Sequence, residues 1–402
     1  MPPETSGDPL FGDDVEQALG EVPEDLDVLG RTTWLRKRLG ADLGRRAAGL
    51  LDLRRKSRAR LGDGWLPYLL PKASEQATAR VVAEDRAETI KEACGSVAIW
   101  DSTCSIGSDS LAAALVGHRV IASDRNEQTL RYAQANLSRC GGQTQVVRAD
   151  VSQPPVRADL LLVDPDRRPD GQRESDPARW SPDLGVALEV AAQHRGACIK
   201  LPPALDPRLI RTEALPSSLS WVSLDGELRE ISLWTGQVSG TSAREAKLLS
   251  SSGARAVLRG EPTDPPSLAP EEARHLRWLA EPDPAVLRSG LLGIAAEEIG
   301  FRSIDPHIAY LAGDREPNSP WVRAWPVLAC VPLDRKRVRA MLASHDIGPV
   351  TVKKRGHPED SDRLAKRFAG PGSRQGLLAV TRLDSGHVAY LLDSPSSAPN
   401  ST

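Results

Sequence analysis

Four aspartates follow short apolar runs in the first half of the chain. They are Asp101, Asp124, Asp150 and Asp164. A single aspartate after such a run is more often a helix N-cap than a ligand. Four in succession indicate one site, because ligands of an open parallel sheet bind outside the carboxyl ends of its strands. Asp124 follows Asp101 by 23 residues, a distance that suits an acid that accepts from the two hydroxyls of a ribose.

Strands and helices must alternate to place these acids at one edge. Short apolar segments and amphipathic stretches alternate from 97 to 202, and "ADLLLVD" (158–164) has the continuous apolar character of a strand buried on both faces. "WVSLDGELREISLWTG" (221–236) predicts an antiparallel hairpin around a "DG" turn. The predicted fold class is α/β: a Rossmann-like, mostly parallel sheet with an antiparallel hairpin at one edge.

The flanking segments differ in character. Leucines at three- and four-residue multiples predict helices before the sheet, the last of them starting at Ser74 as N-cap. Short strands mixed with helices predict a separate α+β module at the C-terminus. The expected division is an acidic disordered tail (1–25), a helical region (26–95), the α/β domain (96–240), a linker or insertion (241–275), the α+β module (276–393) and a disordered tail (394–402).

Composition narrows the class of protein. The chain has 402 residues, a net charge of -2 and no apolar run of membrane-spanning length. Its five cysteines show no C-x-x-C spacing, which disfavours a zinc site or a disulfide framework, and we predict no metal. These features, together with an acidic N-terminus without a signal-peptide pattern, predict a cytoplasmic protein.

The charges are distributed unevenly. Residues 1–30 carry nine acidic and no basic residues, and residues 31–60 carry eleven basic and two acidic residues. Residues 331–382 carry twelve basic and five acidic residues. Basic blocks of this kind predict either a surface for a polyanion or a solvated helix face.

The pattern of strand-end acids resembles the class I S-adenosylmethionine-dependent methyltransferases. Their first motif, D/E-x-G-x-G-x-G, aligns with Asp101, Thr103, Ser105 and Gly107. The resemblance implies that these four residues, with Asp124 and Asp150, bind S-adenosylmethionine. Thr103 and Ser105 replace two of the motif's glycines. Small residues can take the place of glycine in this turn, provided that their φ stays negative. A nicotinamide dehydrogenase is disfavoured, because the glycines that a pyrophosphate requires are absent.

Several segments resemble a narrower bacterial group of these enzymes that carries a C-terminal THUMP-like domain. They include "LVDPDRRPDGQR", "WSPDL", "CIKLPPALD" and "HDIGPVTVKKRGHPED", and the resemblance covers roughly residues 30–392. Related modules belong to RNA-modifying enzymes, so the resemblance implies an RNA partner.

The same family implies roles after the fourth strand. Its motif there is (N/D)-P-P-(Y/F), and this chain has Asp164, Pro165, Asp166 and Arg167. We expect Asp164 to orient the methyl acceptor and Pro165 to rigidify the turn. Further candidates for contacts with the substrate are Arg167 or Arg168 for stacking or clamping a phosphate, Trp180 for the missing ring face, and Lys200, which can instead simply neutralise the acids.

A cysteine-dependent mechanism is disfavoured. The D-P-P-R spelling also occurs in uracil C5 methyltransferases, which need a cysteine nucleophile. Cys198 lies inside an apolar run, where a cysteine usually packs. We therefore expect methyl transfer by proximity, with the acceptor's proton lost to a carboxylate or to water.

RNA is expected to contact the 31–60 block and the segment Lys353, Lys354 and Arg355, after which Gly356 allows close approach of a phosphate. Two alternatives remain open at this point. One is a methyltransferase for a small molecule or a protein. The other is a non-catalytic RNA-binding protein on the same scaffold.

Overall fold

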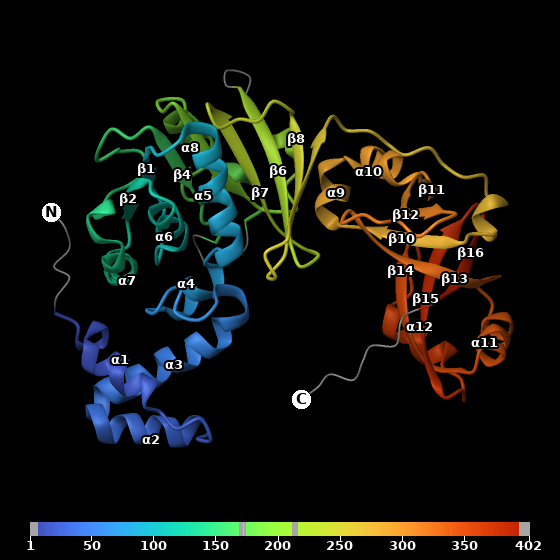
Figure 1. Cartoon of the computed structure of the whole chain (residues 1–402), viewed down its shortest axis with the longest axis horizontal. Helices are drawn as coiled ribbons and strands as arrows, with labels where there is room; N and C mark the ends of the chain where they lie inside the picture. Colours follow the sequence, from blue (N-terminus) through green and yellow to red (C-terminus); the bar gives the residue numbers. More distant parts are fainter. Residues whose placement is uncertain (1–6, 169–171, 173, 211–215, 394–402) are drawn as a thin grey trace. The chain divides into compact units, whose positions relative to one another are not determined.

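A computed structural model describes residues 7–168, 172, 174–210 and 216–393 (Figure 1). The chain divides into two compact units, one comprising residues 1–219 with 230–241 and the other residues 220–229 with 242–402. Among the described residues, no helix is long and apolar enough to cross a membrane. Residues 1–6 and the expected tail at 394–402 lie outside the described residues.

Helices lead into the first unit. They are α1 (Asp13–Gly20), α2 (Val28–Leu39), α3 (Ala41–Leu61), α4 (Pro71–Gln76) and α5 (Arg80–Cys94). The prediction of Ser74 as an N-cap was wrong, because Pro71 starts α4 three residues earlier and Ser74 lies inside that helix. Ala77 is not helical, and α5 begins separately after it.

The prediction of a disordered acidic tail was wrong for residues 7–25. Helix α1 buries Val15, Ala18 and Leu19. The acidic residues of this segment also find partners in the basic block, since Asp8 pairs with Arg46 at 2.5 Å and Glu16 pairs with Arg54. Apolar burial and ion pairing together order a segment whose composition alone suggests disorder.

The sheet of the first unit confirms the α/β prediction. Its strands β1 (Ala98–Asp101), β2 (Arg119–Asp124), β3 (Thr144–Arg148), β4 (Leu160–Val163) and β5 (Gly196–Leu201) are parallel and lie in the order β3-β2-β1-β4-β5. Strand β7 (Glu227–Gly236) is antiparallel to β5. Between the strands run α6 (Ser108–Leu115), α7 (Glu127–Leu137) and α8 (Leu184–Ala191).

The strand order reverses between β1 and β4. The chain proceeds from β1 outward to β2 and β3, and then returns to pair β4 with the other side of β1. A crevice for ligands opens at such a switch point in parallel sheets. Asp101 ends β1, and Asp164 directly follows β4, so both aspartates stand at this point.

Strand β6 (Ser217–Leu224) precedes β7, and the connecting Asp225 and Gly226 have φ of 52° and 79°. This geometry agrees with the predicted hairpin turn. Residues 244–260 form an antiparallel hairpin of β8 (Arg244–Leu249) and β9 (Arg255–Gly260). Of the two alternatives for 241–275, a linker or an insertion, the structure therefore contradicts an extended linker over this stretch.

The second unit contains a sheet in the order β11-β12-β10-β13-β16-β15-β14. Its strands are β10 (Trp278–Pro282), β11 (Arg302–Asp305), β12 (Ile308–Gly313), β13 (Val322–Pro332), β14 (Ile347–Arg355), β15 (Arg374–Leu383) and β16 (Gly386–Leu392). Its helices are α9 (Pro284–Ser289), α10 (Leu292–Ile299), α11 (Arg335–Ser344) and α12 (Ser361–Phe368). Val338 of α11 and Leu364 and Phe368 of α12 share one buried cluster with Val352 and Val380 of the sheet.

Candidate functional site

Asp101 and Asp124 end two neighbouring parallel strands, with the 102–107 turn between them. The Asp101 carboxylate is buried and accepts a hydrogen bond from the Ser110 hydroxyl at 2.5 Å. Burial, reinforced by the negative charge of Asp109, raises the pKa of Asp101 to about 7. The Asp124 carboxylate accepts from the backbone N–H groups of Ser105 at 3.1 Å and Asn126 at 2.8 Å, and burial raises its pKa.

The turn after β1 has already used much of its backbone donor capacity. The N–H of Ser102 donates to the carbonyl of Leu162, and the N–H of Cys104 donates to that of Ser123. The N–H of Ser105 donates to Asp124, and the N–H of Gly107 to the carbonyl of Cys104. A pyrophosphate needs free N–H donors at such a turn. The edge of the sheet at the carboxyl ends of its strands instead offers carboxylate acceptors, which suit a ligand that carries hydrogen-bond donors.

One condition set by the sequence analysis is not met. Ser105 has a φ of 51°, in the left-handed region that glycine adopts at little cost. The condition that the small residues of this turn keep a negative φ therefore fails at Ser105. Gly107 has a φ of 93° and retains the glycine that its conformation requires.

Thr103 explains why a second glycine of the motif can be absent. Its Oγ1 accepts a hydrogen bond from the backbone N–H of Asp164 at 2.6 Å. Glycine has no side chain that could make this contact. The hydroxyl therefore couples the turn after β1 to the turn after β4.

The side chain of Asp164 is also held in place. Its Oδ2 lies 2.5 Å from the Nζ of Lys200, and Lys200 also donates to Thr78 Oγ1 at 2.7 Å. Burial alone would lower the pKa of Lys200, but the carboxylates of Asp109 and Asp164 raise it above its ordinary value. The side chain of Lys200 is 12% exposed and that of Asp164 is 45% exposed. Lys200 thus lies in the interior of the protein. Asp164 lies at the surface, at the edge of the sheet where the carboxyl ends of the strands meet.

A buried ion network lies behind Lys200, and the sequence analysis missed it. Arg86 of α5 pairs with both Asp109 and Glu230. Burial would raise the pKa of Asp109, but Arg86 and Lys200 together lower it to about 2. Arg86 lies on the buried face of α5, and a charged residue within such an apolar stripe was the one available signal of a buried pair.

The loop after β4 places the other candidates differently. Pro165 is buried, which agrees with a rigid turn, and Asp166 forms a two-way backbone bridge with Ser181. Arg167 is half-buried and Arg168 is exposed. Trp180 does not present a free ring face, because it is 5% exposed and its indole N–H donates to the carbonyl of Glu174 at 3.2 Å.

Asp150 and Cys198 are two further candidates whose contacts and burial the structure shows. Asp150 is exposed and accepts from the N–H and hydroxyl of Ser152, hydrogen bonds that lower its pKa. It follows β3, the outer neighbour of β2, and none of its described contacts reaches Asp101 or Asp124. Cys198 is 1% exposed within the core, and burial raises the pKa of its thiol to about 11, in agreement with a packing role.

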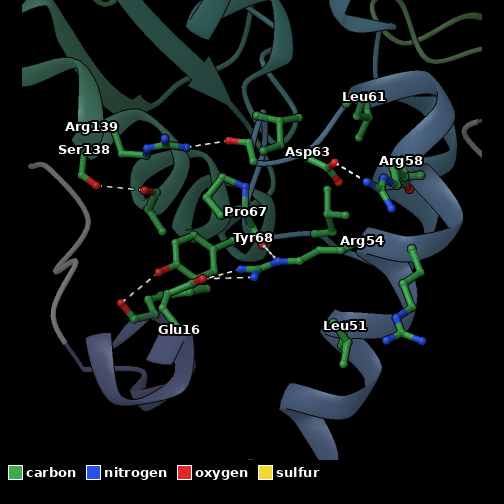
Figure 2. Close-up of a pocket in the computed structure, with 18 of the residues that line it drawn as sticks. Glu16, Leu51, Arg54, Arg58, Leu61, Asp63, Pro67, Tyr68, Ser138 and Arg139 are labelled. Carbon is green, nitrogen blue, oxygen red and sulfur yellow. Dashed lines mark hydrogen bonds and ion pairs between the residues drawn. The ribbon is translucent and has the colours of Figure 1, made fainter. Parts of the chain in front are cut away.

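Six of the eleven basic residues in the 31–60 block form ion pairs inside the first unit. Its ion pairs are Arg31–Asp52, Arg38–Glu21, Arg45–Asp42, Arg46–Asp8, Arg54–Glu16 and Arg58–Asp63. Figure 2 shows Arg54 and Arg58 reaching their acidic partners in a pocket of 710 Å³ between α1, α3 and the end of α7. The Arg139 guanidinium in the same pocket donates to the carbonyl of Gly64 at 2.7 Å. Arg36, Lys37, Arg55 and Lys56 of the block are exposed, so the ion pairs reduce its positive charge without removing it.

The segment Lys353, Lys354 and Arg355, which was also expected to contact RNA, makes contacts within the second unit. Lys353 and Arg355 both bind the Glu281 carboxylate, at 2.5 Å and 3.1 Å. They also lie over the rings of Trp325 and Tyr310. Lys354 donates to the carbonyl of His357. All three side chains are half-buried, and a single carboxylate, that of Glu281, pairs with two of them, so the RNA contact of this segment stays a prediction.

Comparison with known proteins shows to which family the chain belongs. The chain is 32% identical over 362 residues to an uncharacterised S-adenosylmethionine-dependent methyltransferase of Mycobacterium tuberculosis, known from two strains, with 87% of this chain and 97% of the relative covered. The chain belongs to the S-adenosylmethionine-dependent methyltransferases. The family model described as THUMP domain-like matches residues 322–394 of this methyltransferase.

A solved structure agrees with the fold. A protein from Porphyromonas gingivalis W83 assigned as a methyltransferase superposes with a TM-score of 0.70 at 19% identity, over 94% of this chain and 100% of the other. This methyltransferase uses S-adenosylmethionine as its cofactor. The edge residues fit that molecule, because its ammonium group, ribose hydroxyls and adenine amine are all donors and the edge presents carboxylates.

Proposed function

We propose that this methyltransferase acts on RNA and that Asp164 orients the methyl acceptor. The proposed role of Asp164 rests on the observation that two of its groups are held by other residues. Its backbone N–H is bound to Thr103 of the cofactor turn, and its carboxylate is bound to Lys200. Asp164 is thereby fixed relative to the turn that holds the cofactor, while its exposed side remains open to a substrate.

We assign the cofactor contacts by strand. Asp101 faces the ammonium group, since a buried carboxyl with a raised pKa gains most from a cation. Asp124 accepts from the ribose hydroxyls, because it ends the second strand. Thr103, Ser105 and Gly107 shape the turn between them, and Asp150 follows the third strand by two residues.

S-adenosylmethionine supplies an electrophilic methyl group on a positively charged sulfur. Asp164 accepts a hydrogen bond from the methyl acceptor and thereby holds the acceptor in line with the methyl group. The acceptor's lone pair forms the new bond to carbon as the carbon–sulfur electron pair leaves with sulfur, and the acceptor's proton passes to water or to a carboxylate. Positioning of this kind supplies much of the rate enhancement.

Two observations favour RNA over a small molecule or a protein. The THUMP domain-like match covers 322–394, and the block of basic residues at 331–382 includes cations that remain exposed. Pro165, Asp166 and Arg167 complete the loop that would meet a base, and Arg168 stands exposed beside it as a contact for a phosphate.

The test is transfer of a labelled methyl group. The full chain is incubated with methyl-labelled S-adenosylmethionine and total bacterial RNA, protein extract or small-molecule extract in separate reactions. Ribonuclease-sensitive label that Asp164→Ala lowers by about 100-fold, with affinity for S-adenosylhomocysteine retained, would support the proposal. Label that appears only in the protein or small-molecule reaction would replace RNA as the substrate.

A further inference from the structure

The second unit carries a set of exposed cations that form no salt bridge among the described residues, and Asp360 interacts electrostatically with one of them, Arg363. Helix α11 contains four basic residues and no acidic one, and α12 adds further basic residues. We name five of them the α11–α12 cations, namely Arg335, Lys336, Arg337, Arg363 and Lys366, which are exposed and form no salt bridge in the described part of the chain. They contrast with Lys353 and Arg355, which share Glu281.

The acidic residues nearby are already engaged. Asp334 caps α11 by accepting from the N–H groups of Lys336 and Arg337, and Asp360 caps α12 in the same way. Asp346 accepts from Ser373, and Glu359 pairs with Arg367 at 2.8 Å. Asp362 is the acidic residue within α12 itself. The two helices carry seven basic residues against these five acids, so the surface keeps a net positive charge.

Both helices contribute to one surface. Their apolar sides enter the same buried cluster against β14, β15 and β16, so their exposed basic sides face away from that cluster. The guanidinium of Arg339 on α11 donates to the carbonyl of Ala369, directly after α12, at 3.4 Å. The cations are thus carried by two helices fixed beside each other on a rigid sheet.

We propose that the α11–α12 cations bind the phosphate backbone of double-helical RNA. This inference rests on the proposed function and names the surface and the form of RNA. Fixed cations suit a preformed backbone, and RNA helices are recognised mainly through shape and backbone contacts. Phe368, the aromatic residue of these helices, is fully buried, so these helices offer no aromatic ring on which a base could stack.

A lipid surface fits less well. An interfacial helix inserts large apolar side chains between headgroups. The exposed large apolar residues of the described chain are Val28, Leu29, Leu115, Val156, Leu209 and Leu328. None of these residues lies on α11 or α12. The surface therefore offers charge without the apolar anchor that a membrane requires.

The experiment measures binding of the full chain to an RNA hairpin of about 20 base pairs at several salt concentrations. The variant R335Q/K336Q/R337Q removes three charges from α11, and R363Q/K366Q removes two from α12. The control R274Q/R277Q/R315Q removes three exposed charges from elsewhere in the same unit. An unfolding scan and S-adenosylhomocysteine binding confirm that each variant is folded.

We expect the α11 variant to reduce the slope of log affinity against log salt by about 2 to 3, and the α12 variant by about 1 to 2. The control variant should leave the slope unchanged, and the charge-retaining R335K/R337K should bind like wild type. Wild type should prefer the hairpin to an unstructured strand of equal length.

Equal slopes for wild type and both helix variants would overturn the inference, and RNA methylation by the same preparation would then leave the proposed function standing. Equal or tighter binding to the unstructured strand would overturn the assignment of double-helical RNA. Binding to vesicles with anionic headgroups but not to RNA would assign the surface to a membrane. The absence of both RNA binding and RNA methylation would remove the inference and the proposed function together.

Discussion

The Nζ of Lys200 lies 2.5 Å from Oδ2 of Asp164, so a buried lysine on β5 fixes an exposed carboxylate that follows β4. Lys200 is itself fixed by Thr78, which precedes α5, and by Asp109 of α6 at 3.4 Å. The sequence analysis considered Lys200 as a substrate contact or a neutralising charge. The structure favours a positioning residue that acts through Asp164.

Replacement of Lys200 should separate positioning from cofactor binding. Lys200→Met should lower methyl transfer by about 10- to 100-fold, because Asp164 loses its fixed orientation. The free energy of unfolding should fall by about 1–3 kcal/mol, because Thr78 and Asp109 lose a donor. Affinity for S-adenosylhomocysteine, measured by calorimetry, should stay within about threefold.

Lys200→Arg keeps the charge and should recover part of the activity. If Lys200→Met transferred methyl groups at the wild-type rate while unfolding more easily, Lys200 would be a stabilising residue without a role in positioning.

Thr103 replaces a motif glycine, and we predict that restoring the glycine impairs the enzyme. Thr103→Gly should lower methyl transfer by about tenfold, because the N–H of Asp164 loses the acceptor at 2.6 Å. Thr103→Ser retains a hydroxyl and should behave like wild type, whereas Thr103→Val should behave like the glycine variant. Higher activity of Thr103→Gly than of wild type would show that the threonine is merely tolerated.

Ser105 should carry backbone strain, since its φ is 51°. Ser105→Gly should raise the free energy of unfolding by about 0.5–1 kcal/mol, a value that allows for the larger conformational entropy of glycine in the unfolded chain. Ser105→Ala keeps the strain and serves as the matched control, for which denaturant titration should show no gain. An equal gain in both variants would place the effect in the lost hydroxyl.

Asp101 should make cofactor binding depend on pH. Its pKa of about 7 lies above that of the unfolded chain, so it is largely protonated below neutral pH. A bound ammonium favours the ionised form, and affinity for S-adenosylhomocysteine should therefore rise by up to about tenfold per pH unit until about pH 7 and then level off. Calorimetry in buffers of different ionisation enthalpy should detect proton release below that pH.

The same group makes stability depend on pH with the opposite sign. Because the folded chain holds this proton more tightly than the unfolded chain, ionising Asp101 lowers stability as pH rises toward about 7. Asp101→Asn should therefore raise the melting temperature more at about pH 8 than at about pH 5, while weakening cofactor binding. A gain that is independent of pH would mean that Asp101 does not titrate in this range.

The strand-end acids could be predicted from sequence because they depend on local pattern. Asp101 and Asp124 each follow an apolar run, and the order of strands places both at one edge. The partners of Arg86 could not be predicted in this way, since Glu230 lies 144 residues away along the chain. The contacts of the cationic segment at 353–355 could not be predicted for the same reason, because Glu281, which pairs with Lys353 and Arg355, lies more than 70 residues upstream.

The central claim is that S-adenosylmethionine binds between Asp101 and Asp124 and presents its sulfur toward Asp164. A crystal structure of the S-adenosylhomocysteine complex tests it most directly. We predict that the ribose hydroxyls donate to Asp124, the ammonium approaches Asp101, and the sulfur faces an open space beside Asp164 still bound by Thr103 and Lys200. A ligand bound elsewhere, or a sulfur turned away from Asp164, would contradict the account.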